Sequence, residues 1–408
     1  MRFEVITVGL SFAVTSLYWL IAAFRMSAAN YGHMMQLQAF IFVVTAIFSL
    51  RTHDLVFYLH KAHSCSLKRS FNFTQILEIA LVIFSTATTI IASLIINKAT
   101  NSQVIGDDIL IAICISFLAN ITIMQGSSIA YLRAQHLDIN IAWSDFFAIG
   151  AWSGALFWLT TRGNLHIFEI LGVGFAAAAT KPILLLIISR CSSVLNFSNA
   201  EVIQANLDRK SILYFLLAGQ FTNMMKNSLV SLETLLLGRL VSAESVAVFR
   251  IARSFLGLTT AMLNISYQKT YRELVKCKTL SEIELTTNLM NRNSVKLWAF
   301  SIPLMLIASS LFSNLNGSAT YDNLSLMTLM SAATYLPIAL QQTFYARLSL
   351  AASFGKINMA YVIGTGFFLI FCLVTTTFIT LPLFIFIIGI ANFTRLWIMR
   401  NAVRDTSQ

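Results

Sequence analysis

Two arginines interrupt the apolar run AVFRIARSFLGL at residues 247–258. A charged side chain at the centre of a membrane helix costs about 2.5–3.5 kcal/mol on insertion scales, so Arg250 and Arg253 need a compensating environment. On a helix these arginines begin a polar stripe that continues through Thr260 and Asn264. Such a stripe is costly against lipid but favourable against a hydrated cavity. The alternative is that both arginines extend their side chains to the exterior interface.

A second polar surface is predicted on the preceding run, residues 211–238. Gln220, Asn223 and Asn227 step by three or four residues and therefore share one helix face, while Lys226 and Glu233 share a neighbouring direction. The two runs together predict two walls of a water-filled cavity with net positive charge. Glu233 is then either the partner that neutralises an arginine or a carboxylate that couples transport to proton movement.

Other charges within the apolar runs have weaker assignments. Lys181 precedes Pro182 in a stretch of small residues, where a cavity position and a packing position are both open. Arg25 ends the first run and is predicted at the interface, with a position in the cavity as the alternative. We expect the remaining charges to lie at helix ends and to reach the interface: Glu78, Asp145 and Arg395.

The sequence carries no pattern typical of catalysis or metal binding. There is no serine–histidine–aspartate constellation and no phosphate-binding loop, and the five cysteines show no CxxC spacing. We therefore expect no enzyme activity, no cofactor, no metal and no nucleic-acid partner. The residues that come nearest to a metal cluster match no known ligand spacing: His53, His60, His63 and Cys65.

The elements that must position these residues are membrane helices. The chain has 408 residues, of which 57% are hydrophobic and only 11% charged, a composition typical of polytopic membrane proteins. The fold class is predicted to be all-α, with about twelve transmembrane helices in two six-helix lobes. The apolar runs lie at residues 5–24, 34–50, 75–96, 109–131, 139–160, 166–188, 211–238, 246–267, 294–313, 322–346, 357–377 and 381–399.

The distribution of basic residues predicts the orientation. Of the 28 lysines and arginines, 19 lie at the termini and in the alternate connections on the same side, whereas four lie in the opposite connections. The positive-inside rule therefore places both termini in the cytoplasm. We expect a multi-pass protein of the bacterial inner membrane whose basic loops contact anionic membrane lipids.

The chain also shows signs of duplication. RMSAANYG follows the first run and RLVSAESVA follows the seventh, so a similar turn occupies the same place in each set of six. This repeat predicts a lobe at residues 1–188, a cytoplasmic linker at 189–210 and a second lobe at 211–408. Residues 268–293 are predicted to form either an amphipathic interfacial helix or a solvated loop.

Residues 242–274 resemble the start of the C-terminal half of Wzx-type oligosaccharide flippases, which belong to the polysaccharide exporter family of the MOP superfamily. The shared pattern is an acidic turn, an arginine- and alanine-containing span and a closing aromatic and Glu-Leu element, and SAANYG is similar to the corresponding N-terminal turn. Ala247 stands where the family usually has glycine, and Arg272 where it usually has proline.

The resemblance implies translocation of a polyprenyl-pyrophosphate-linked oligosaccharide repeat unit to the outer leaflet by alternating access, as in O-antigen, lipopolysaccharide and other polysaccharide biosynthesis. Other polysaccharide-assembly membrane proteins would then be partners. The pyrophosphate would contact Arg250, Arg253, Lys226, Lys181 and Arg25, and the sugar hydroxyls would contact Gln220, Asn223, Asn227 and Asn264. Two alternatives remain: a cation-coupled small-molecule or multidrug exporter of the same superfamily, and a membrane-embedded polysaccharide polymerase or ligase.

Overall fold

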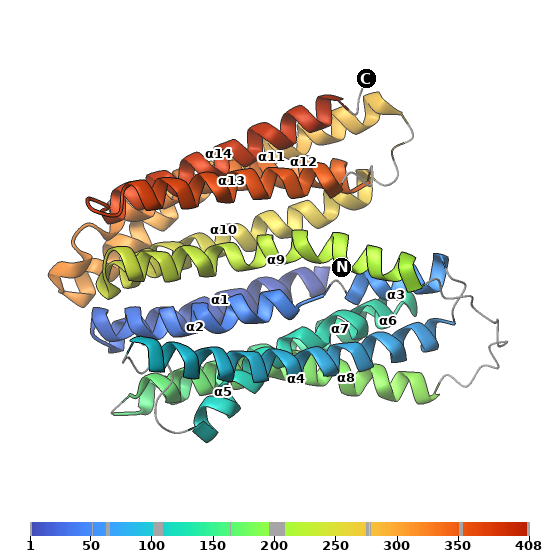
Figure 1. Cartoon of the computed structure of the whole chain (residues 1–408), viewed down its shortest axis with the longest axis horizontal. Coiled ribbons are helices and arrows are strands. Elements are labelled where there is room, and N and C mark those ends of the chain that lie inside the picture. The colour runs from blue at the N-terminus through green and yellow to red at the C-terminus, as the bar shows by residue number, and fades with distance from the viewer. Residues whose placement is uncertain are drawn as a thin grey trace. The chain divides into compact units, whose positions relative to one another are not determined.

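The computed structural model describes residues 2–50, 52–62, 66–100, 109–163, 165–195, 209–274, 277, 279–350 and 354–405. In this part of the chain every regular element is a helix, as predicted (Figure 1). The elements in order are α1 (Arg2–Arg25), α2 (Ala28–Phe48), α3 (Thr52–Ala62), α4 (Leu67–Thr100), α5 (Ile109–Asn120), η1 (Ile121–Gln125), α6 (Gly126–Ala134), α7 (Asp138–Thr161), α8 (Ile167–Leu195), α9 (Arg209–Leu240), α10 (Ala243–Leu274), α11 (Leu280–Asn316), η2 (Ala319–Tyr321), α12 (Leu324–Leu350), α13 (Phe354–Val374) and α14 (Leu381–Asp405).

Each of the twelve predicted spans corresponds to one long helix or, for the fourth, to the continuous series α5–η1–α6. Nine candidate membrane spans among the described residues satisfy criteria of length and apolar composition. The helices α7, α9 and α10 are not among these nine, and the last two carry the polar surfaces identified in the sequence. The all-α membrane fold is therefore confirmed.

The distribution of side chains suits a lipid environment. Large apolar side chains lie on the surface, for example Phe157 at 70% exposure and Phe300 at 73%. Polar side chains such as Thr74, Ser85 and Thr89 are instead completely buried. Their hydroxyl groups donate to helix backbone or to other polar side chains, as groups inside a bilayer must.

The fourth span is interrupted at η1, and Glu78 of α4 stabilises the interruption. Its carboxylate accepts hydrogen bonds from the Ser127 backbone N–H at 2.8 Å, the Ser127 hydroxyl at 2.5 Å and the Thr52 hydroxyl at 2.5 Å. These bonds satisfy donors at the start of α6 that the helix itself leaves free. The interfacial position expected for Glu78 is therefore wrong, because the side chain is fully buried.

Neither alternative for residues 268–293 is correct, because this segment is divided between the ends of two long helices. The helix α10 continues to Leu274, and α11 begins at Leu280. Thr279 defines the start of α11 through a capping box with Glu282, in which each side chain accepts a hydrogen bond from the other residue's backbone N–H. Gly317 ends the helix with φ of 65°, a left-handed conformation that glycine adopts without strain.

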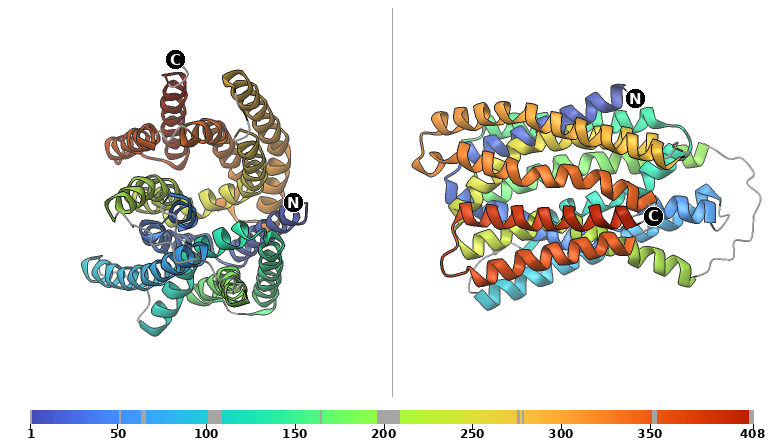
Figure 2. Two further views of the ribbon diagram at one scale, coloured as in Figure 1. Left: turned by 90° about the vertical axis from the view of Figure 1, so that its right-hand side faces the viewer. Right: turned by 90° about the horizontal axis from the view of Figure 1, so that it is seen from above.

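Contacts divide the chain into two compact units, which are described separately. The first contains the residues up to Ile21 together with Leu37–Leu232, and the second contains Ala22–Gln36 and Glu233–Gln408. In the second unit α12 packs against α10, α11 and α14, and α13 packs against α14; Figure 2 gives two further views of the helices. The predicted lobe boundaries at residues 188 and 211 stay a prediction.

The orientation can be tested on α11 alone. This helix has 37 residues and is therefore about 55 Å long, enough to place its two ends on opposite sides of a membrane. In a variant without native cysteines, Asn316→Cys should react with a membrane-impermeant thiol reagent in intact cells, and Ser281→Cys should react only after permeabilisation. The reverse labelling pattern would overturn the predicted cytoplasmic termini.

Candidate functional site

A buried ion pair joins α9 and α10 in the second unit. The part of α9 in this unit, residues 233–240, is separated from α10 only by Val241 and Ser242 and forms a tight hairpin with the start of α10. Ser242 caps α10 by accepting a hydrogen bond from the Ser245 N–H at 3.1 Å. This hairpin brings Arg253 Nη1 to 2.5 Å from Glu233 Oε2. The side chains of Arg253 and Glu233 are only 14% and 3% exposed, respectively, so the pair is largely shielded from solvent.

The neighbourhood of the two arginines is aromatic. The guanidinium carbon of Arg253 lies 5.3 Å from the centre of the Phe249 ring, within the range of a cation–π interaction. Arg250 interacts electrostatically with Tyr31, a fully buried residue of α2, and with Arg253. The Arg253 guanidinium therefore contacts both a carboxylate, of Glu233, and an aromatic ring, of Phe249.

Arg395 of α14 lies in the same unit and is buried to 1% exposure, so the interfacial position expected for it is wrong. It donates hydrogen bonds to Asn392 Oδ1 at 2.7 Å and to Thr365 Oγ1 at 3.4 Å, and it lies 5.9 Å from the centre of the Tyr361 ring. Gly364 makes room for it, because a Cβ at this position would overlap the Arg395 side chain. The two hydrogen bonds satisfy Nη1 and Nη2 of the buried guanidinium, whereas its Nε has no hydrogen-bond partner among the described residues.

Glu233 and Arg253 connect these groups into one cluster, since Arg250 interacts with Arg253. Besides its ion pair with Arg253, Glu233 interacts electrostatically with Arg395. The cluster consists of Arg250, Arg253, Arg395 and Glu233, and its three guanidinium groups outnumber its single carboxylate. Two or three arginines that converge in a protein interior bind phosphate and carboxylate groups well, since the guanidinium donors match their geometry.

The first unit holds a separate ion pair. Lys181 Nζ of α8 lies 2.5 Å from Asp145 Oδ1 of α7, and the aspartate side chain is only 3% exposed. The interfacial position expected for Asp145 is therefore wrong. The pair joins two neighbouring helices, and the contact between Lys181 and a substrate stays a prediction.

The remaining predicted site residues are divided between the two units. Gln220 donates to the Ile47 carbonyl oxygen at 2.6 Å, Lys226 is exposed on α9, and Arg25 is exposed at the end of α1. Gln220, Lys226 and Lys181 belong to the first unit, whereas Arg25, Glu233, Arg250 and Arg253 belong to the second. The structure thus brings together Glu233, Arg250 and Arg253, and the wider shared cavity stays a prediction. The side chains of Asn223, Asn227 and Asn264 lie outside the described part of the structure.

Of the histidines and cysteine considered for metal binding, His63 and Cys65 lie outside the described residues. Among the residues that the structure describes, no group of three or more histidine, cysteine, aspartate or glutamate side chains is arranged to hold a metal ion.

Sequence reasoning missed Arg395 and its partners. Asn392 and Arg395 are three residues apart, so their side chains lie on one helix face. This spacing was a signal that Asn392 could accept a hydrogen bond from the guanidinium without the arginine reaching the interface. The space for the Arg395 side chain at Gly364 lies on α13, 31 residues earlier in the sequence, and no local pattern connects the two residues.

Comparison with known proteins identifies the fold. No protein-family model and no curated protein sequence matches the chain. The structure is similar to an outward-facing multidrug resistance MATE family transporter of the MOP superfamily, at 14% identity and a TM-score of 0.69 over 100% of this chain and 96% of that chain. An inward-facing structure of such a transporter gives 15% identity and a TM-score of 0.62, over 98% and 96% of the two chains.

A MOP superfamily transporter from Pyrococcus furiosus is also similar, at 13% identity and a TM-score of 0.64 over 100% of this chain and 96% of that chain. That protein is described as having a binding pocket of reverse polarity that suggests a different function. At these identities the similarity establishes the fold of MOP superfamily transporters over almost the whole length of the chain.

Proposed function

We propose that this protein is a membrane exporter that works by alternating access and carries an anionic substrate. The fold supports the transport part of the proposal, because proteins with this fold are known in inward-facing and outward-facing conformations. The observation that supports the anionic part is the charge of the buried cluster, in which Glu233 interacts with Arg253 and Arg395, and Arg250 lies near Arg253.

The substrate that this charge favours is a polyprenyl-pyrophosphate-linked oligosaccharide repeat unit, moved from the cytoplasmic to the outer leaflet of a bacterial inner membrane. A pyrophosphate carries several acceptor oxygens, and arginine donates to such groups through paired N–H bonds. The resemblance of residues 242–274 to Wzx-type flippases supports the same substrate class.

The second candidate is a cation-coupled small-molecule exporter. The solved structures with this fold include multidrug resistance transporters, and this similarity supports the second candidate more directly than it supports a flippase. A pocket for cationic drugs, however, requires a surplus of carboxylates, and Glu233 is already neutralised by Arg253. An exporter of anionic small molecules would satisfy both observations.

The candidates are separated by transport assays with purified protein in liposomes. One assay follows translocation of a fluorescent polyprenyl diphosphate that carries a single sugar, detected by chemical quenching of the label in the outer leaflet. The other follows uptake of a cationic dye under an imposed proton or sodium gradient. For the wild type we expect translocation of the lipid-linked sugar and no dye uptake. Arg253→Ala should reduce translocation about 100-fold, because it removes a desolvated arginine–phosphate contact of about 3 kcal/mol.

Dye uptake without translocation of the lipid-linked sugar would overturn the anionic proposal in favour of the multidrug exporter. Arg292→Ala is the matched control, because this arginine of α11 is exposed and lies outside the cluster. Transport that falls equally in both variants would show that the effect is not specific to the cluster.

A further inference from the structure

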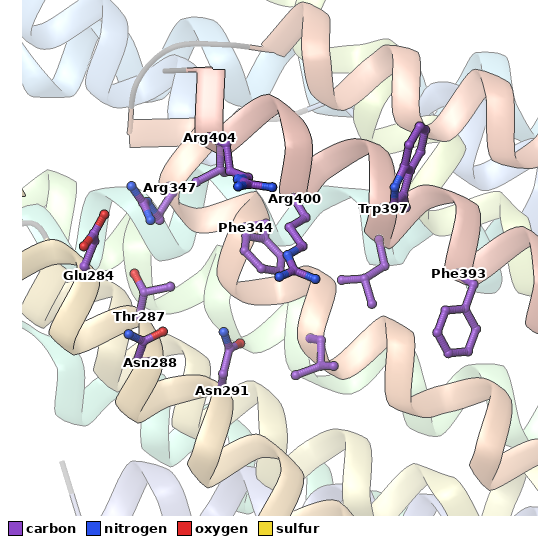
Figure 3. Close-up of a pocket in the computed structure, with 13 residues that line it drawn as sticks. Glu284, Thr287, Asn288, Asn291, Phe344, Arg347, Phe393, Trp397, Arg400 and Arg404 are labelled. Carbon is purple, nitrogen blue, oxygen red and sulfur yellow. The ribbon is translucent and has the colours of Figure 1, made fainter. Parts of the chain in front are cut away.

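The second unit contains a cavity that the proposed transport site does not use. It lies between α11, α12 and α14 and has a volume of about 780 Å³ (Figure 3). The cluster around Glu233 contributes none of its lining residues. The lining residues are Glu284, Thr287, Asn288, Asn291, Leu340, Phe344, Arg347, Phe393, Leu396, Trp397, Arg400, Val403 and Arg404.

Three arginines give one end of this cavity a positive charge. Arg400 and Arg404 are four residues apart on α14 and therefore lie on the same helix face, where like charges repel each other unless an anion lies between them. Arg347 joins them from the last turn of α12. Glu284 of α11 is the one carboxylate in the lining, so the arginines exceed the acid by two charges.

Neither Arg400 nor Arg404 forms an ion pair within the part of the chain that the structure describes. Figure 3 shows the Arg400 side chain extending from α14 into the space that Asn291 of α11 faces. Asn291 accepts a hydrogen bond from the Thr343 hydroxyl at 2.8 Å through its Oδ1. This bond fixes the orientation of the side chain and leaves its amide N–H groups as donors.

The other end of the cavity is apolar. Phe393, Leu396 and Trp397 of α14 line it together with Leu340 and Phe344 of α12. Phe393 is 59% exposed and Trp397 is 66% exposed, as is typical of side chains that meet lipid at a membrane surface. Arg347 and Arg404 lie in the last turns of α12 and α14, and Arg400 lies one turn earlier, at the ends predicted to face the cytoplasm.

This arrangement matches the shape of a phosphate-bearing lipid. Guanidinium and amide donors surround a space for the headgroup, and the aromatic and aliphatic side chains continue from it along the direction of an acyl or prenyl chain. We propose that the cavity between α11, α12 and α14 binds the phosphate group of a membrane lipid from the cytoplasmic leaflet. The proposal does not depend on the transport activity, because none of the residues that line the cavity belongs to the cluster around Glu233.

The test is lipid binding to the purified, delipidated protein, measured by native mass spectrometry. The three lipids are phosphatidylglycerol, a polyprenyl monophosphate and the zwitterionic phosphatidylcholine. We expect one equivalent of an anionic lipid to bind more tightly than phosphatidylcholine. Arg400→Gln/Arg404→Gln should weaken this binding about 30-fold, since each basic side chain near an anionic headgroup contributes about fivefold.

Arg292→Gln/Lys296→Gln is the matched control, because these exposed residues of α11 lie outside the lining and the change in net charge is the same. Arg400→Lys/Arg404→Lys should retain part of the affinity, since the charge remains. Because both arginines are exposed, the variants should fold, which an unchanged melting temperature would verify.

The two anionic lipids distinguish the sources of the phosphate. Tighter binding of phosphatidylglycerol would support a bound bilayer lipid, and tighter binding of the polyprenyl phosphate would support a waiting position for a prenyl-linked substrate. Equal binding of all three lipids would overturn the proposal, as would an equal loss in the control variant.

Discussion

Glu233→Gln should lower the free energy of unfolding by about 3–5 kcal/mol, because it leaves the guanidinium of Arg253 buried without its carboxylate partner. The ion pair is short, at 2.5 Å, and the Glu233 side chain is only 3% exposed, so water cannot replace the missing charge without rearrangement. The measurement is the midpoint of thermal unfolding in detergent, followed by tryptophan fluorescence or by aggregation.

The double variant Glu233→Gln/Arg253→Gln separates a structural role of the pair from a role in binding. Removing both charges eliminates the unpaired group, so most of the lost stability should return. If Arg253 contacts an anionic substrate, transport should stay low in the stable double variant. Recovery of both stability and transport would show that the pair only holds α9 against α10.

A coupling role of Glu233 has its own readout. If the carboxylate takes up a proton when a substrate displaces it from Arg253, transport by the wild type should respond to an imposed proton gradient. The glutamine variant should then lose that response. A response that persists in Glu233→Gln would leave Glu233 without any part in coupling.

Most of the fold could be predicted from the sequence, because the signals for membrane helices are local. Apolar runs of helix length predicted each long helix. The observed helix ends differ from the predicted ends where a capping residue defines them, as Thr279 does for α11. The segment at residues 268–293 was misjudged because its charged residues resemble a loop, whereas helices in a membrane protein commonly continue beyond the bilayer. The break at η1 depends on Glu78 from another helix, and no local pattern reveals that contact.

The candidate site was predictable only in part. Glu233 and Arg253 could be connected from sequence because a short turn separates their helices, and antiparallel neighbours bring such residues together. Arg395 and Asp145 were misjudged, because an interfacial position is the ordinary explanation for a charge near a helix end. Their partners are Thr365 on α13 and Lys181 on α8, and only tertiary packing brings these residues into contact.

The two similar turns recognised in the sequence meet in the second unit. Gly32 belongs to SAANYG at residues 27–32, and Ala243 belongs to SAESVA at residues 242–247. The two residues are in such close contact that a Cβ at Gly32 would overlap the Ala243 carbonyl. Near this contact Tyr31 and Ala247 are completely buried, so the start of α2 packs tightly against the start of α10. Glycine at position 32 is therefore required by packing.

Gly32→Leu should break this contact, because the obstructing atoms are backbone and no change of rotamer relieves the overlap. In a background without native cysteines, Ala247→Cys should be unreactive toward a polar thiol reagent when Gly32 is present and should react when Gly32 is leucine. Transport should fall by at least about fivefold, since overpacking of this kind costs roughly 1–3 kcal/mol and shifts the conformational equilibrium of the transporter by that amount.

Gly9→Leu is the matched control, because Gly9 lies on α1 with no other atoms within 4 Å of its added Cβ. It changes the same residue type to the same bulk and should leave both the labelling of Ala247→Cys and the transport rate unchanged. Gly32→Ala should give an intermediate result, since a single methyl group already meets the Ala243 carbonyl but displaces the helix less. Normal transport together with protected Ala247→Cys in Gly32→Leu would show that the turn tolerates the bulk. The packing of the two repeated turns would then have no part in the transport cycle.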